Sequence, residues 1–173
     1  MEQSTPGGDL NVLDGIALVM GSAIASAHIL RVIRSDLTAA GWLLVWLTFV
    51  WVAVTASGPF IFLARRYSRH LPGYPQIGDL LWTLLGLPWL LTAVIQSAVP
   101  ASEPGQNPLF VGALSLGLAI ACIIALVILW RTWVMVPAEQ AARLEAAPWT
   151  NRVGLILAIA WPVQCGLGMV ILS

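Results

Sequence analysis

The stretch from Leu109 to Trp130 contains 22 residues with neither a charged side chain nor a proline. About 20 consecutive apolar residues are enough for a helix to cross the hydrocarbon core of a bilayer. Inside lipid, backbone N–H and C=O groups find no water, so a single crossing segment must bond them internally as a helix. This stretch therefore predicts a membrane-spanning helix.

Four further apolar runs occupy residues 11–33, 37–64, 79–99 and 153–172. Charged residues make up only 9% of the chain and apolar residues 59%, whereas a soluble domain carries about 25% charged residues. We therefore predict an all-α fold, a single membrane domain of residues 1–173 built as a polytopic helix bundle with five transmembrane helices. The alternative is four crossings, in which the first or the third run does not span fully; Pro88 interrupts the third run and makes it the weaker of the two.

Residues 137–147 predict a short interfacial helix between the last two spans. Pro137 suits the first turn of a helix, and Glu139 and Arg143 are spaced as an i,i+4 ion pair. Pro148 ends the pattern.

The second apolar run ends abruptly at a basic cluster, in which Arg65, Arg66 and Arg69 occur within five positions. With five crossings, one side of the membrane holds six arginines, Arg131 among them, and the other side holds two. The positive-inside rule then places the N-terminus in the cytoplasm and the C-terminus outside a bacterial inner membrane. We expect these four arginines to set the topology and to attract anionic lipid headgroups, at about 1 kcal/mol each.

The polar residues of the first run fall on one helix face. Asp14, Gly21 and His28 are seven residues apart, with Ala17 and Ala25 between them at helical spacing. Such small, polar faces pack against neighbouring helices in lipid. Fourteen residues of helix separate Asp14 from His28 by about 21 Å, so the two side chains belong near opposite membrane surfaces.

Two readings of Asp14 follow from this position. A buried acid in a membrane helix indicates a functional site, such as that of a carrier. Alternatively, Asp14 lies near the headgroups and pairs with Arg131 or Arg152. Gln96 and Gln164 are the other polar candidates inside the spans, and we expect both to join helices through hydrogen bonds.

His28 has two readings as well. An imidazole in a membrane helix can ligate haem or a chlorin, and the small-residue face of the first span leaves room for a flat ring. The simpler reading is a histidine that forms a hydrogen bond across helices.

No catalytic motif is recognisable: there is no phosphate-binding loop, no HExxH, no CxxC and no GxSxG. The zero net charge gives no basic field for nucleic acid. We therefore expect a non-enzymatic structural or accessory subunit that contacts lipid and packs against membrane protein partners or further copies of itself. The alternatives are a haem- or chlorin-binding protein using His28, and a small carrier or channel using Asp14 and the proline-kinked helices. The nine tryptophans are expected to be mostly interfacial anchors.

Overall fold

The computed structural model of the chain describes residues 12–30, 38–68, 76–98, 108–134 and 149–172, without the side chains of residues 68, 108–111, 132–134 and 163–172. The predicted interfacial helix at 137–147 and Arg69 lie outside these residues, as does the side chain of Gln164. The described residues form five helices and no strand, which confirms the all-α prediction. The helices are α1 (Val12–Ile29), α2 (Ala39–Ser68), α3 (Ile77–Ala98), α4 (Pro108–Val134) and α6 (Trp149–Leu172).

Within the described residues, α1 to α4 are long and apolar enough to cross a membrane. Proline does not interrupt the helices: Pro59 lies inside α2, Pro88 inside α3 and Pro162 inside α6, and each of these helices is continuous. Two boundaries differ from the sequence prediction in ways that matter below. α2 continues beyond Arg66 to Ser68, and α6 begins at Trp149 rather than at residue 153.

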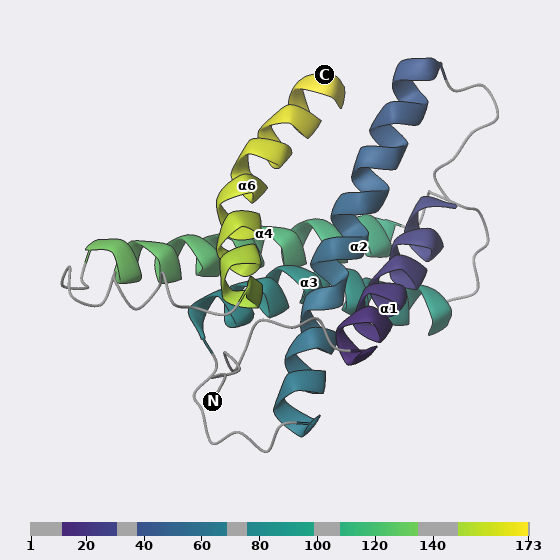
Figure 1. Ribbon diagram of the computed structural model, residues 1–173. Coiled ribbons are helices and arrows are strands. Elements are labelled where there is room, and N and C mark those ends of the chain that lie inside the picture. The colour runs from purple at the N-terminus through teal and green to yellow at the C-terminus, as the bar shows by residue number, and fades with distance from the viewer. Residues whose placement is uncertain (1–11, 31–37, 69–75, 99–107, 135–148, 173) are drawn as a thin grey trace, which may run out of the picture.

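α1 and α2 run in opposite senses, as do α3 and α4, and α3 and α4 run across α1, α2 and α6 rather than alongside them (Figure 1). α1 packs mainly on α2, while α3 contacts α2, α4 and α6 and so forms the centre of the bundle. The starts of α1, α3 and α6 and the ends of α2 and α4 lie toward the lower and left part of the view.

The crossing of α2 and α3 depends on glycine. A Cβ added at Gly86 would overlap the Thr55 carbonyl oxygen and the Pro59 ring, and one added at Gly58 would lie 2.5 Å from the Trp82 carbonyl oxygen. The Trp82 indole N–H donates a hydrogen bond of 2.7 Å to the Val54 carbonyl oxygen. Small residues that let two backbones approach are the usual basis of close helix packing in lipid.

Tryptophan fills much of the interior, which is not what the sequence analysis predicted. Trp82 and Trp161 are 2% and 4% exposed, and Trp51 stacks on Trp161 with ring centroids 5.8 Å apart. Among the tryptophans whose side chains the structure describes, Trp42, Trp46 and Trp130 are exposed, as interfacial anchors would be. Trp82 and Trp161 fill helix contacts, because amphipathic aromatic rings also pack there when a carbonyl or another ring is within reach.

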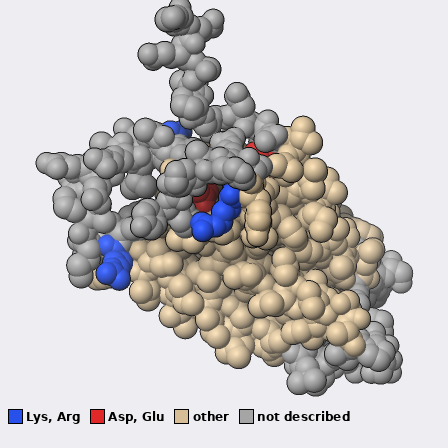
Figure 2. Space-filling model, turned by 90° about the horizontal axis from the view of Figure 1, so that it is seen from below, with Lys and Arg blue, Asp and Glu red and all other residues tan. Residues whose placement is uncertain are grey.

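All six charged residues of the described ranges lie at the same end of the bundle, where α1, α3 and α6 begin and α2 and α4 end. Seen from below, the charged atoms gather toward one edge, while a broad part of the surface carries none (Figure 2). The six are Asp14, Arg65, Arg66, Asp79, Arg131 and Arg152.

Candidate functional site

The inner face of α1 is the stripe that the spacing predicted. The buried residues of α1 are Asp14, Ala17, Gly21, Ala25 and His28. Gly21 lies directly on α2, since a Cβ there would overlap the Ala53 carbonyl oxygen. α1 therefore presses its smallest residues against α2 and places one polar group near each end of the contact.

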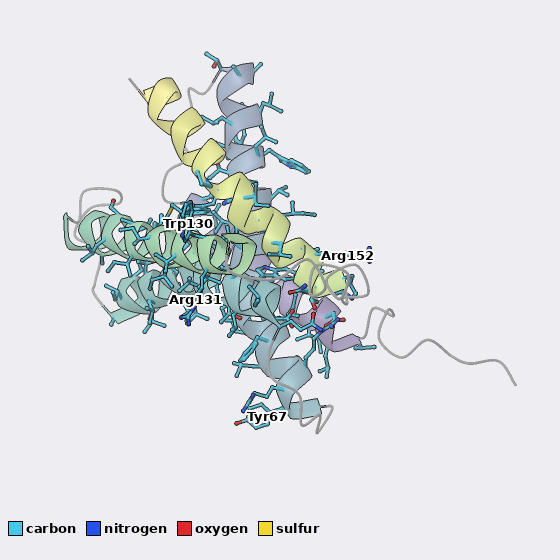
Figure 3. All side chains as sticks on the ribbon, turned by 90° about the vertical axis from the view of Figure 1, so that its left-hand side faces the viewer. Tyr67, Trp130, Arg131 and Arg152 are labelled. Atoms are coloured by element: carbon cyan, nitrogen blue, oxygen red, sulfur yellow. The ribbon has the colours of Figure 1, made fainter. Side chains whose placement is uncertain are left out.

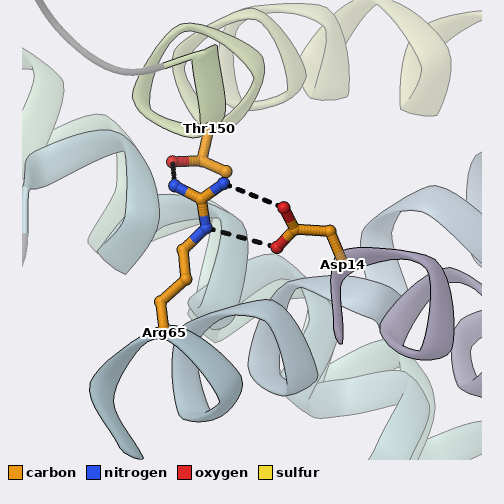
Figure 4. A network of polar contacts seen from close by, with 3 residues as sticks. All are labelled: Asp14, Arg65 and Thr150. Carbon is orange, nitrogen blue, oxygen red and sulfur yellow. Dashed lines mark hydrogen bonds and ion pairs between the residues drawn. The ribbon is translucent and has the colours of Figure 1, made fainter. Parts of the chain in front are cut away.

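At the charged end, Asp14 of α1 meets Arg65 of α2 side-on (Figure 4). Arg65 Nε donates to Asp14 Oδ1 at 3.3 Å and Nη2 donates to Oδ2 at 3.1 Å. Arg65 Nη1 donates to Thr150 Oγ1 of α6 at 3.2 Å. One guanidinium thus joins three helices, and charge-assisted bonds with two parallel N–H groups are the strongest class of side-chain hydrogen bond.

This ion pair is largely withdrawn from solvent. The Asp14 side chain is 2% exposed and that of Arg65 17%. The Arg65 guanidinium carbon also lies 5.2 Å from the centroid of the Trp149 ring, and Trp149 makes an edge contact with Trp82 of α3. The guanidinium is therefore held by a carboxylate, a hydroxyl and an aromatic face, each from a different residue.

A second polar contact joins α6 to α3 beside the ion pair. Asn151 Oδ1 accepts a hydrogen bond of 2.6 Å from the backbone N–H of Gly78, which is in the first turn of α3. The first four N–H groups of a helix have no partner within the helix, so Asn151 caps α3 from a neighbouring helix. Gly78 of α3 and Gly154 of α6 face each other at this contact. A Cβ added to either glycine would overlap the backbone of the other helix. We call Asp14, Arg65, Thr150 and Asn151 the polar clasp.

Asp14 forms an ion pair with Arg65, which is not one of the two partners, Arg131 and Arg152, that the sequence suggested. The reason is that α2 stays helical past Pro59 and through Arg66, so Arg65 still faces the bundle instead of starting a surface loop. Arg66 and Arg131 are exposed. Gln96 is partly buried, but its Oε1 accepts no hydrogen bond within the described residues, so the predicted helix-joining bond is not seen there.

His28 lies at the other end of α1 and is 7% exposed. Its Nε2 is 3.0 Å from the Trp89 carbonyl oxygen of α3, and its ring meets the Trp89 ring edge-on at 5.6 Å. This is the hydrogen bond across helices that the simpler reading expected. The small-residue face is filled by α2 at Gly21 and Ala25, so a macrocycle between α1 and α2 would require these helices to separate.

Sequence reasoning missed Trp149, Thr150 and Asn151, because the fifth span was started at residue 153. A signal was present: Pro148 is followed by Trp149, Thr150 and Asn151, and Thr or Asn just before an apolar run marks a helix start. Nothing local could have paired these residues with Arg65 and Gly78, which lie more than 70 positions away in the chain.

The buried polar residues of the described part share one property. Each takes part in a hydrogen bond with another group of the chain. The residues are Asp14, His28, Thr55, Ser57, Thr92, Thr150 and Asn151. The described residues contain no group of three or more His, Cys, Asp or Glu that could hold a metal ion.

No protein-family model, curated protein or solved structure matches this chain.

Proposed function

We propose that this protein is a non-enzymatic membrane subunit that acts by packing against other membrane proteins or further copies of itself. The observation that carries the proposal is the use of the buried polar groups. In the described part, the seven buried polar residues all take part in hydrogen bonds within the chain, and four of them, Asp14, His28, Thr150 and Asn151, bond across helices. The side-chain nitrogens of Trp51, Trp89 and Trp149 and the side-chain oxygen of Gln96 are buried without a hydrogen-bond partner there. Bonds across helices favour a rigid body with an apolar exterior, which suits a scaffold better than a catalyst or a pathway.

Transport through Asp14 has less support from the same geometry. A carboxylate that carries an ion must exchange its partner, whereas both Asp14 oxygens accept hydrogen bonds from one guanidinium that Thr150 and Trp149 also hold. Releasing it would leave an uncompensated charge in an apolar setting.

Purification from the native host tests the subunit proposal. After extraction in mild detergent, we expect the chain to run in a particle heavier than one 18.5 kDa protein plus its micelle. Mass spectrometry should find a second membrane protein, or a second copy, at a fixed ratio. A monodisperse single chain at native expression level, with no protein enriched over an unrelated membrane protein purified in parallel, would contradict the proposal.

The location proposed for this subunit is a bacterial inner membrane, with the charged end of the bundle at the cytoplasmic face. Four arginines and two aspartates gather at that end in the described residues, and positive charge is retained on the cytoplasmic side. With each helix crossing once, the N-terminal side of α1 is then cytoplasmic.

Thiol labelling in intact cells tests this orientation. Cysteines placed one at a time at the exposed Tyr67, at the end of α2, and at the exposed Thr38, just before α2, in a background without Cys122 and Cys165, report the two ends. A membrane-impermeant maleimide should leave Tyr67→Cys unlabelled until the cells are opened and should label Thr38→Cys from outside. The reverse pattern would refute the orientation.

A further inference from the structure

Two neighbouring arginines at the end of α2 have different environments. Arg65 is turned into the bundle, where Asp14 and Thr150 accept its hydrogen bonds. Arg66 is exposed, and Tyr67 beside it is 78% exposed. Successive residues of a helix point about 100° apart, so two adjacent residues of one type can serve an inner and an outer surface.

The end of α4 repeats the outer arrangement. Trp130 is 67% exposed and Arg131 follows it, also exposed. Tyr67, Trp130 and Arg131 lie at the ends of α2 and α4 (Figure 3). An amphipathic aromatic ring next to an arginine is the typical composition of a helix end at the level of lipid headgroups.

The charge of this end is suited to an anionic partner. Among the six charged residues of the described part, Asp14 and Arg65 offset one another in the clasp. Arg66 and Arg131 are exposed at this end, whereas the acid Asp79 is partly buried. A guanidinium matches the oxygens of a phosphate with two parallel N–H groups, and its attraction to an anionic leaflet acts within a Debye length of the surface.

We propose that Arg66 with Tyr67, and Arg131 with Trp130, bind the headgroups of anionic phospholipids at the rim of the charged end, and that Arg65 takes no part. The proposal does not depend on the subunit role. The sequence predicted topology and lipid attraction for Arg65, Arg66, Arg69 and Arg131 alike. In this proposal Arg65 holds helices instead, and Arg66 and Arg131 hold lipid.

Native mass spectrometry of the full chain, titrated with dioctanoyl phosphatidylglycerol, tests this division. We expect Arg66→Gln and Arg131→Gln each to weaken binding about fivefold and the double variant about 30-fold, with thermal stability unchanged because both residues are exposed. The Arg66→Lys/Arg131→Lys variant keeps both charges and should stay within a few-fold of wild type. Dioctanoyl phosphatidylcholine should bind the wild type and the double variant equally weakly.

Three results would overturn the proposal. The first is phosphatidylglycerol binding that is the same in the double Gln variant and the wild type. The second is equal binding of the two lipids by the wild type. The third is displacement of the lipid by inorganic phosphate at a few times the lipid concentration, which would assign the arginines to a free anion instead.

Discussion

Asp14→Asn should lower the free energy of unfolding by about 3 kcal/mol or more. The substitution keeps the shape of the side chain but leaves the Arg65 guanidinium beside a neutral amide, with the Arg65 side chain only 17% exposed. Removing one partner of a buried ion pair costs about 3–5 kcal/mol, because the remaining charge is uncompensated. The measurement is unfolding of the purified chain in mixed micelles, followed as the mole fraction of a denaturing detergent is raised.

Asp79→Asn is the matched control, since it removes the same charge at the same end of the bundle. Asp79 lies in the first turn of α3 and is only partly buried, so its loss should cost about 1 kcal/mol or less. Equal destabilisation by the two variants would mean that Asp14 contributes only a general charge effect.

Gly154→Leu should be the second severe change. A Cβ at this position would overlap the Gly78 carbonyl oxygen, and a backbone atom cannot rotate out of the way as a side chain can. Overpacking costs about 1–3 kcal/mol when neighbours can shift, and we expect a loss at or above the top of that range. The shift should also break the bond between Asn151 and Gly78, so the Gly78 N–H should exchange with deuterium faster.

Gly112→Leu provides the comparison for Gly154→Leu. A Cβ at Gly112 meets nothing within 4 Å, and the residue is exposed. Its stability should change by about 0.5 kcal/mol or less. If both glycine variants behaved alike, close approach of α3 and α6 would not be what position 154 requires.

The helical fold and the inner face of α1 were predictable from the sequence, because both depend on local patterns. Long uncharged runs specify helices, and the spacing of Asp14, Gly21 and His28 specifies one face. The ion-pair partner was not predictable in this way. It depends on α2 remaining helical past Pro59, which brings Arg65 onto α1 from 51 positions away in the chain.

The placement of α3 across α2 was beyond sequence reasoning for a similar reason. Gly58 and Gly86 are ordinary small residues in the sequence, and only their meeting on Trp82 and Pro59 fixes how the two helices cross. The same crossing brings Trp82 to the Val54 carbonyl oxygen. The position of a tryptophan within an apolar stretch of sequence does not distinguish a buried residue such as Trp82 from an interfacial anchor. A buried tryptophan and an interfacial one both use an apolar ring and an indole N–H.

A double-substitution cycle at Asp14 and Arg65 tests the central claim, that the buried polar clasp of this membrane protein holds its helices together. The variants are Asp14→Leu, Arg65→Leu and both together, with unfolding free energies measured in the same mixed micelles. Each single change should cost about 3 kcal/mol or more, and the double variant should be more stable than their sum by about 1–3 kcal/mol, since no charge is left unpaired. Strictly additive losses would show that the two residues do not act as a pair and would contradict the account.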